Sequence, residues 1–246
     1  QGLSEEDLID WTEELRAEAK AIFDEHIAGP IFTPPIVKGE GDKLGVLMMP
    51  SAAGGANWRG AAVDPETGWL YVPSVTLVTS LAVNPTDSAR SKFRYVGFPE
   101  LVNGPRGLPL IKPPYSRITA IDLNEGVHRW QVAHGPGPKD HPAIAHLELP
   151  DLGSNSQGVL SNGGLVLTKS LLFIIQAELD EQSMTRQGKR GHLRAFDKTD
   201  GELLWEYEME PTPHSTPITY MHEGKQYVVL AAGGDGQPAQ LVAFAL

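Results

Sequence analysis

The residues best suited to contact a ligand lie in a glycine-rich stretch, AAGGANWRGAAVDPETGWLYVPS, which begins at Ala52. Gly55 lies just before the pair Asn57 and Trp58 in this stretch. Glycine lets a backbone approach a flat ring system closely, an Asn amide can donate a hydrogen bond, and an indole offers a polarisable edge. The alternative interpretation is structural, with Asn57 capping a turn and Trp58 filling the core. The residue pattern alone favours this structural interpretation.

A second glycine-rich stretch, AAGGDGQPAQ, runs from Ala231 to Gln240 and contains Gly234 and Asp235. It follows an apolar run that predicts a buried strand, and a glycine-rich turn in such a place can come close to a ligand. A plain turn explains the same residues equally well. Both interpretations stay open at this point.

Three histidines, His134, His141 and His146, share the segment HGPGPKDHPAIAH. Their spacing fits neither one face of a helix nor alternate positions of a strand, so we expect a loop with unliganded histidines rather than a metal site. The chain contains no cysteine, which excludes thiolate metal sites and a cysteine nucleophile. The sequence also lacks the motifs typical of serine hydrolases, zincins, P-loop proteins and dinucleotide-binding folds.

The composition is that of a globular protein with an acidic surface. The chain has 246 residues and a formal net charge of −11. This charge argues against nucleic-acid binding, because phosphates are neutralised by clustered Lys and Arg. The nearest basic cluster, TRQGKRGHLR from Thr185 to Arg194, lies between two expected strands and is interpreted as a solvated loop. No apolar run reaches the length of a membrane span, which is about 20 residues.

The first thirty residues have a helical pattern. Ser4 is an N-cap candidate with Asp7 three residues further on, and Gly29-Pro30 ends the pattern. Thr12 is a candidate cap for a second helix, which would split the segment in two. The apolar residues fall on one stripe at helical spacing. We therefore expect residues 1–30 to pack on the rest of the chain rather than to have a function of their own.

After Pro50 the pattern changes to short β runs separated by turn residues. No helical pattern falls between these runs, which predicts an antiparallel all-β chain over residues 31–246. Two long loops, 77–114 and 133–162, interrupt it, and loops of this length are usually functional or cover something. The expected strands are 69–76, 117–122, 128–132, 164–168, 171–176, 192–197, 203–208, 216–221, 226–232 and 240–245.

An internal repeat is the most informative feature of the sequence. Residues 120–130 and 195–205 both have the form A-x-D-x-x-x-G-x-x-x-W, and residues 62–71 are a degenerate third copy. In each copy the Asp carboxylate can accept turn N–H groups, and the Gly supplies the positive φ that reverses the chain. The returning strand delivers a Trp that can pack on a neighbouring unit, with its N–H directed at a carbonyl. Four-stranded units that interlock through a Trp predict a β-propeller.

These residues resemble the pyrroloquinoline quinone (PQQ)-dependent dehydrogenases, quinoproteins of the glucose- and alcohol-oxidising type. The resemblance covers nearly the whole chain and is carried by GGANWRGAAVDPETGWLYVP, ITAIDLNEG, LRAFDKTDGELLWEYE and STPITYMHEGKQYVVLAAGGDG. It implies an eight-bladed propeller, of which this carboxy-terminal portion would form two blades and most of a third. Because a propeller needs about four to eight blades to close, we expect missing blades or a partner chain to complete it.

The resemblance also implies a cofactor site near the propeller axis, where PQQ lies beside a Ca²⁺ ion and an Asp acts as general base. It places Asn57 and Trp58 beside the quinone, with Gly55 in the same loop. It matches Gly234 and Asp235 to a loop near the cofactor in the glucose-oxidising branch, although a His often stands where this chain has Asp235. The family's calcium ligands and base belong to the part that precedes this chain, so no catalytic residue or metal ligand is assigned.

The implied reaction is hydride removal from an alcohol or sugar carbon to the quinone, followed by electron transfer to a membrane quinone or a cytochrome. The implied location is the periplasm, and the isolated chain is expected to be inactive. The alternative is a non-catalytic β-propeller scaffold or binding protein with the same Trp-docking repeats. Such a scaffold would have no reason to keep a glycine-framed Asn57-Trp58 pair, so the pair favours the enzyme.

Overall fold

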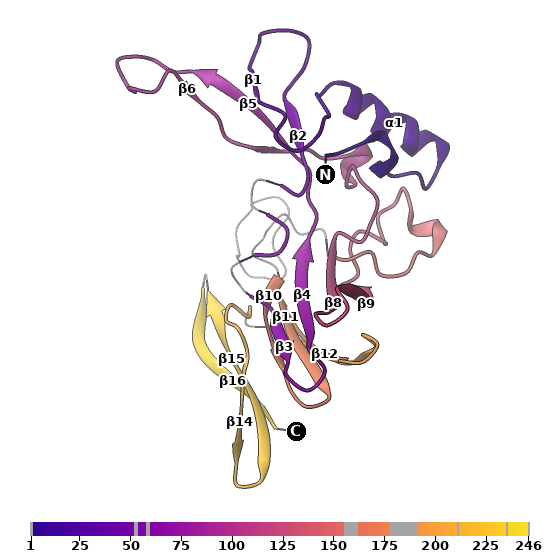
Figure 1. The fold of residues 1–246 in the computed structure, drawn as a ribbon, viewed down its shortest axis with the longest axis vertical. Coiled ribbons are helices and arrows are strands. Elements are labelled where there is room, and N and C mark those ends of the chain that lie inside the picture. Colours follow the sequence, from indigo (N-terminus) through magenta and orange to yellow (C-terminus); the bar gives the residue numbers. More distant parts are fainter. Residues whose placement is uncertain are drawn as a thin grey trace.

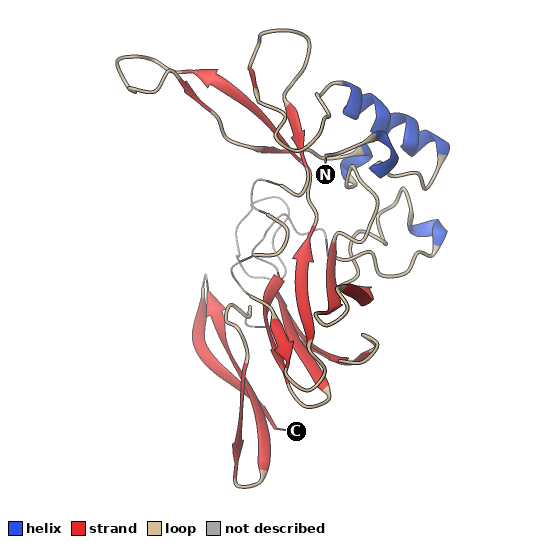
Figure 2. Ribbon diagram, viewed as in Figure 1, coloured by secondary structure: helices blue, strands red, loops and turns tan. Residues whose placement is uncertain are grey.

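A computed structural model of the chain describes residues 2–51, 54–57, 60–154, 162–177, 191–210, 212–234 and 236–245. Strands dominate these residues, and the α-helix lies at the end of the molecule opposite the C-terminus (Figure 2). Within the described part of the chain, no helix has both the length and the apolar character needed to cross a membrane.

The N-terminal segment forms two helices, as its two candidate caps predict. A 3-10 helix, η1 (Glu5–Asp7), follows Ser4, and the Ser4 N–H donates to the Asp7 carboxylate over 2.7 Å. Helix α1 (Glu13–Asp24) follows Thr12, whose hydroxyl accepts a hydrogen bond from the Leu15 N–H at 3.1 Å. These side-chain bonds satisfy backbone donors that have no partner within a helix. The split of the helical segment at Thr12 is therefore confirmed.

Three antiparallel sheets make up the lower part of the molecule in Figure 1. The first sheet consists of β3 (Ala62–Asp64), β4 (Trp69–Val75), β8 (Ser116–Asp122) and β9 (Val127–Ala133). The second consists of β10 (Asn162–Leu167), β11 (Leu171–Ala177), β12 (Gly191–Asp197) and β13 (Leu203–Met209). The third consists of β14 (Ile218–His222), β15 (Lys225–Gly234) and β16 (Gln237–Ala245). Two four-stranded blades and three strands of another are the partial propeller that the repeat predicts.

The segment 77–114, expected as a long loop, contains regular structure instead. It holds β5 (Thr79–Pro85), β6 (Tyr95–Val96), β7 (Glu100–Leu101) and the 3-10 helix η2 (Pro105–Gly107). With β1 (Ile36–Val37) and β2 (Val46–Met48), these strands form a separate small sheet. Strand β1 pairs with β5 in parallel, so the all-antiparallel expectation is wrong in this sheet. The other expected loop, 133–162, contains the short 3-10 helix η3 (Ala145–Leu147).

The three blades stack face to face through two apolar layers. Neighbouring residues of β11 show how this works, because Ile174 faces the first sheet and Ile175 faces the third, as the period of two along a strand requires. The layer between the first and second sheets contains Tyr71, Ile118, Ala120, Leu165, Leu172, Ile174 and Phe196. The layer between the second and third sheets contains Phe173, Ile175, Leu193, Ala195, Met209, Val228, Leu230 and Ala232.

A third apolar cluster holds the N-terminal helices in place. Leu15 and Ala19 of α1 are buried in it, and they pack against two connecting segments outside the first sheet, 101–115 and 143–152. The buried residues of these segments are Leu108, Leu110, Ile111, Tyr115, Ile144 and Leu152. The helical segment thus packs on the connections above the blades, which agrees with its position in Figure 1.

The pairing of the strands gives every blade two distinct ends. At one end, which we call the turn end, lie the tight turns 64–68, 122–126, 197–201 and 222–225. The opposite end, which we call the loop end, carries the starts of β3, β10 and β14, the first strand of each sheet. The segments that contain Asn57 and Gly234 both lie at the loop end, whereas the repeat turns lie at the turn end.

Candidate functional site

The turn end shows the geometry that the repeat predicts. The N–H groups of Gly68, Gly126 and Gly201 donate to the carbonyls of Asp64, Asp122 and Asp197 over 2.8, 2.8 and 3.0 Å. The three glycines have φ values of 72°, 70° and 81°, a region that favours glycine. Each Asp carboxylate also accepts a turn N–H, from Glu66, Asn124 and Thr199 respectively.

The degenerate copy of the repeat occupies a different place from the other two. Its turn, 64–68, connects the first two strands of the first sheet, whereas the turns 122–126 and 197–201 connect the last two strands of their sheets. Residues 62–71 therefore do not mark a separate blade. The true blade-to-blade repeat is the pair of eleven-residue matches that both contain a Trp.

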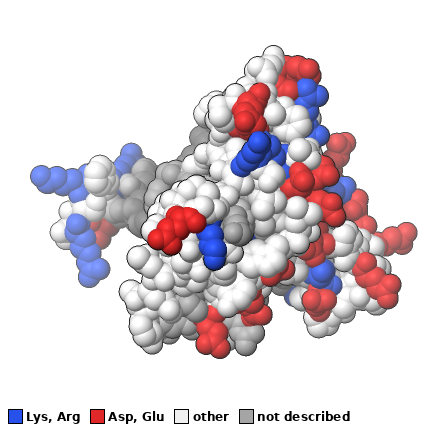
Figure 3. All heavy atoms as spheres, turned by 90° about the horizontal axis from the view of Figure 1, so that it is seen from below, with Lys and Arg blue, Asp and Glu red and all other residues white. Residues whose placement is uncertain are grey.

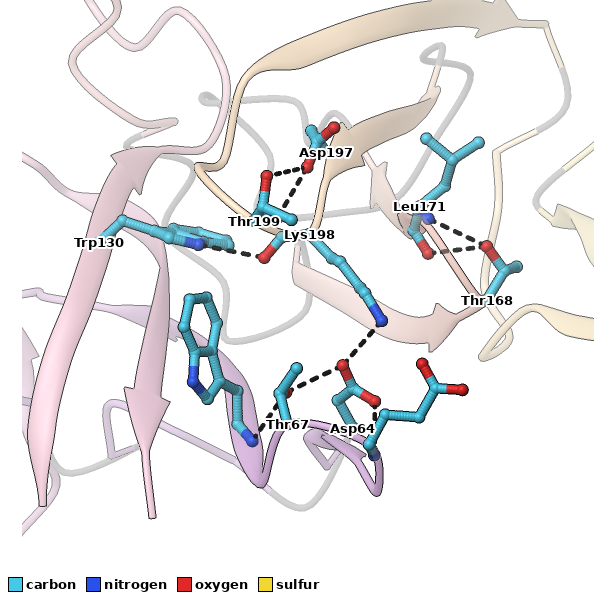
Figure 4. A network of polar contacts seen from close by, with 10 residues as sticks. Asp64, Thr67, Trp130, Thr168, Leu171, Asp197, Lys198 and Thr199 are labelled. Atoms are coloured by element: carbon cyan, nitrogen blue, oxygen red, sulfur yellow. Dashed lines mark hydrogen bonds and ion pairs between the residues drawn. The ribbon is translucent and has the colours of Figure 1, made fainter. Parts of the chain in front are cut away.

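Trp130 docks on the neighbouring blade as the repeat predicts (Figure 4). Its indole N–H donates to the carbonyl of Lys198 at 3.2 Å. The ring lies against Gly201, where an added Cβ would come within 2.8 Å of the indole. Gly201 is thus required twice, for its positive φ and for the space that Trp130 fills. By contrast, an added Cβ on Gly126 in the equivalent turn of the first sheet would meet nothing within 4 Å.

A buried ion pair lies beside this docked Trp, and sequence reasoning missed it. The Lys198 ammonium contacts the Asp64 carboxylate at 2.7 Å, with side-chain exposures of 11% and 3% (Figure 4). The Lys198 hydrogen bond holds the pKa of Asp64 below its usual range. Burial, together with the nearby Asp64 and Asp197, raises the pKa of Tyr71 to about 12. The Asp64–Lys198 pair and the Trp130 hydrogen bond both connect the first sheet to the second, so these contacts of the turn end join blades.

The loop end contains the glycine-framed segment that the sequence singles out. Gly54 and Gly60 have φ values of 81° and 92°, and the N–H of Gly54 donates to the Ser51 carbonyl at 2.9 Å and that of Gly60 to the Asn57 carbonyl at 3.1 Å. Gly55 accepts a hydrogen bond from the N–H of Val75, at the end of β4. These bonds tie the segment to the first sheet and leave Asn57 half-buried. Trp58, predicted beside it, lies outside the described residues.

The second glycine-rich stretch lies at the same end, in the β15–β16 hairpin. Gly234 pairs with Gln237 there, and Asp235 lies outside the described residues. Gly233 has a φ of 141°, and a Cβ on it would come within 2.9 Å of the Ala239 Cα. Glycine is thus required by the packing of the hairpin itself. The structure brings Gly55, Asn57 and Gly234 to one end of the blades, in segments of the first and third sheets.

A polar network between the first two blades was not predicted. The buried Arg194 guanidinium donates to Glu206 at 2.9 Å and also to the side chain of Gln176, whose amide donates to Ser154. His192 lies 2.7 Å from the same Glu206 carboxylate. The interpretation of Thr185–Arg194 as a solvated loop is therefore wrong at its end, because Gly191 to Arg194 belong to β12. The signal that was available is Phe196, an aromatic residue two positions after Arg194 and therefore on the same face of the strand.

The three histidines of the segment 134–146 have different surroundings. His134 is fully buried, with its ring centroid 6.2 Å from that of Phe196. The His141 ring accepts a hydrogen bond from the Ala143 N–H at 3.2 Å, and His146 is exposed. Throughout the described residues, no group of three or more His, Cys, Asp or Glu side chains could hold a metal ion.

The cofactor contacts that the family resemblance implies fall at the loop end, as far as the structure describes them. Asn57 carries a side-chain amide at a half-buried position, and Gly54, Gly55 and Gly60 lie in the same segment.

Comparison with known proteins identifies the family. Residues 1–228 match the family described as glucose/ethanol/alcohol dehydrogenase, β-propeller domain, which carries the label PQQ. The chain is 29% identical over 213 residues to the quinate/shikimate dehydrogenase (quinone) of Acinetobacter baylyi, with 78% of this chain and 25% of that protein covered. It is 30% identical over 232 residues to the quinoprotein glucose dehydrogenase of Escherichia coli K12, covering 84% of this chain and 26% of the relative.

Two further matches are a curated relative and a solved structure. The glycerol dehydrogenase large subunit of Gluconobacter thailandicus is 30% identical over 236 residues, with 82% of this chain and 28% of the relative covered. Among solved structures, the quinohemoprotein alcohol dehydrogenase of Comamonas testosteroni matches with a TM-score of 0.48 and 19% identity, over 84% of this chain and 28% of that one. The chain spans about a quarter of the length of the curated relatives that it matches. From the match over residues 1–228, the chain belongs to the β-propeller family of PQQ-type glucose, ethanol and alcohol dehydrogenases.

Proposed function

We propose that this chain is the carboxy-terminal portion of a PQQ-dependent dehydrogenase that oxidises an alcohol or a sugar. The single observation that carries the proposal is the family match over residues 1–228. The relatives are dehydrogenases of quinate or shikimate, glucose and glycerol, all of which carry hydroxyl groups. Oxidation of an alcohol carbon is the reaction that these substrates share.

In the proposed enzyme, the loop end of this chain forms one wall of the cofactor site. When bound, PQQ would supply the carbonyl that takes up the two electrons from the alcohol carbon. The Asn57 amide would donate a hydrogen bond to a quinone oxygen, which holds the ring in place and stabilises negative charge on that oxygen. Gly55 lies in the same segment, where an added Cβ would come within 3.3 Å of the Val75 carbonyl. We include Trp58, Gly234 and Asp235 among the residues that would contact the cofactor.

The rest of the site comes from outside this chain in the proposal. The Ca²⁺ ligands and the Asp base lie in the missing blades, and the 246-residue chain alone is therefore inactive. In this proposal, electrons pass on to a quinone or a cytochrome. Two relatives have such acceptors in their names, the quinate/shikimate dehydrogenase (quinone) of Acinetobacter baylyi and the lupanine 17-hydroxylase (cytochrome c) of a Pseudomonas species. The proposed location is the periplasm.

The test uses the full-length protein that contains this chain, loaded with PQQ and Ca²⁺ and assayed with a soluble electron acceptor on quinate, glucose, glycerol and ethanol. Oxidation of at least one of them is expected only when PQQ is present. Asn57→Ala should lower kcat/KM about tenfold, the effect of losing one hydrogen bond to a charged oxygen. Asn124→Ala is the matched control, because Asn124 bonds the Thr67 carbonyl at the turn end and should leave kcat/KM unchanged.

Two results would contradict this proposal. A full-length protein that is well folded but neither binds PQQ nor oxidises any of these substrates would be a propeller scaffold instead. Turnover by the 246-residue chain alone would overturn the assignment of the base and the calcium ligands to the missing blades.

A further inference from the structure

A narrow hairpin projects from the molecule on the side away from helix α1. Residues 84–98, which we call the arm, contain the end of β5, strand β6 and the turn between them, and they extend to the upper left in Figure 1. The turn is ordered by Asp87, whose carboxylate accepts the Ala89 N–H at 2.8 Å and whose carbonyl accepts the Arg90 N–H at 2.9 Å. The Thr86 N–H donates to the Arg94 carbonyl at 3.0 Å.

The arm alternates basic and aromatic side chains in the sequence RSKFRYVGF. Phe93 and Phe98 are each 77% exposed, and Tyr95 is also exposed, with the Arg94 guanidinium 5.2 Å from its ring centroid. Large apolar side chains this far out of a core are costly in water, and grouped exposure of this kind marks interaction surfaces.

The charge of the arm also sets it apart from the rest of the chain. The net charge of the protein is −11, yet the arm carries Arg90, Lys92 and Arg94 against one acidic residue, Asp87. Figure 3 shows Lys and Arg gathered on the lobe that projects to the left. Among the described residues, none of these three basic side chains lies in an ion pair. Exposed bases elsewhere do have acidic partners, for example Arg106 with Glu18 at 2.6 Å.

We infer that the arm docks the protein on an anionic lipid surface. Basic groups near such a surface are attracted to anionic headgroups, and aromatic rings on the same segment enter the interface between headgroups and acyl chains. An acidic protein would be held by a complementary surface of about 800 Å², and a two-stranded hairpin is narrow for that. The inference rests on the proposed function in one respect, because a quinone acceptor would lie in a membrane.

The direct test places an environment-sensitive fluorophore on the arm of the full-length protein. These 246 residues contain no cysteine, and any cysteine elsewhere in the full-length protein is first replaced by Ser. Ser88→Cys then introduces a labelling site at the exposed turn of the arm, and Ser170→Cys provides a matched site at the turn end. Vesicles of phosphatidylcholine with 30% phosphatidylglycerol should shift the emission of the Ser88 label to the blue, and pure phosphatidylcholine should not. No shift, or an equal shift at Ser170, would overturn the inference.

Charge variants test the chemistry of the contact. Arg90→Glu with Lys92→Glu should weaken the vesicle response of the Ser88 label at least tenfold, because each basic residue near the surface contributes to the attraction. Lys169→Glu with Lys225→Glu changes the net charge equally at the exposed turn end and should alter the response less than twofold. Equal effects of the two pairs would show a general charge effect and contradict a role for the arm.

Two further outcomes separate this inference from its alternatives. If soluble polyglutamate shifts the Ser88 label more strongly than anionic vesicles do at equal charge, the partner is an acidic protein and the lipid assignment is wrong. If the full-length protein oxidises no substrate with any acceptor while the label still responds to anionic vesicles alone, the proposed function fails and the docking surface stands.

Discussion

The two ends of the blades differ in the contacts that the structure shows at them. At the turn end, Asp64 pairs with Lys198, and Trp130 donates to the Lys198 carbonyl, so that groups of one blade find their partners on the next. At the loop end, Asn57 is half-buried in a segment framed by glycines with positive φ. The first arrangement joins neighbouring blades. The second is the segment that we propose as a wall of the cofactor site.

This difference explains why the repeat is regular while the candidate site is not. Between the first and second sheets, docking uses the turn, the glycine and the Trp of the repeat, whereas Trp205 of the second copy contacts Phe244 of the third sheet. A cofactor is bound once, and each blade can contribute different residues to it. The free energy of unfolding should therefore respond to changes at the turn end, and cofactor affinity to changes at the loop end.

The largest effect is expected from breaking the buried ion pair. Lys198→Met leaves the Asp64 carboxylate buried without its partner, which should lower the free energy of unfolding of this chain by about 3–5 kcal/mol. Denaturation with urea, monitored by Trp fluorescence, measures the loss. The double variant Asp64→Asn with Lys198→Met should recover most of it, because Asn is neutral and still offers an oxygen to the turn. A double variant that loses the sum of both changes would contradict a coupled pair.

A smaller effect is expected at Gly201, the glycine against which the Trp130 ring packs. Gly201→Ala should cost about 3 kcal/mol of unfolding free energy, from the positive φ and from the contact with the Trp130 ring. Gly126→Ala has the same kind of φ but nothing within 4 Å, so it should cost only about 1 kcal/mol. Urea denaturation of both variants of this chain gives the difference, which is the contribution of Trp docking. Equal losses would show that the docked ring contributes nothing.

The turn end should also make stability depend on pH. Hydrogen bonding to Arg129 lowers the pKa of Asp122 to about 2, from an ordinary value of 3.8. The stabilisation is present above pH 4 and is lost as the pH falls through 2. Between these values Asp122 is already protonated in the unfolded chain but still charged in the folded one. The urea midpoint of Asp122→Asn should therefore differ from that of the wild type at pH 5 and converge with it near pH 2. Parallel profiles over this range would contradict the role of the pair.

The smallest effect on stability is expected at the loop end. Asn57→Ala removes a half-buried side chain and should change the free energy of unfolding by no more than about 0.5 kcal/mol. The same denaturation experiment measures it, with Lys198→Met as the contrasting variant. A loss of 2 kcal/mol or more would make Asn57 a structural residue and favour the turn-capping interpretation of the glycine-rich segment.

The sequence predicted what depends on local chemistry. Asp122, Gly126 and Trp130 specify a turn and a docking side chain through their spacing alone, and the caps Ser4 and Thr12 specify two helices. It failed where the partner is distant in the chain. Nothing near Lys198 indicates that it pairs with Asp64, and the buried setting of Arg194 depends on Gln176 and Glu206 from neighbouring strands.

The small sheet around β5 was missed for a related reason. Its strands are short, and its partners β1 and β2 come from the segment that follows the N-terminal helices, so the pairing is set by tertiary contacts rather than by local pattern. The candidate site was predicted partly from residues and partly from the family resemblance. Asn57 and Gly55 lie at the loop end, and their contact with a cofactor stays a prediction. Trp58 and Asp235 stay predictions.

The central claim is that the loop end binds the cofactor and the turn end joins the blades. The most direct measurement is the PQQ dissociation constant of the full-length apoprotein with Ca²⁺, determined for wild type, Asn57→Ala and Asn124→Ala, each with its urea midpoint. The account predicts about tenfold weaker PQQ binding for Asn57→Ala with an unchanged midpoint, and wild-type affinity for Asn124→Ala. Wild-type PQQ affinity in Asn57→Ala, or equal weakening in both variants, would contradict it.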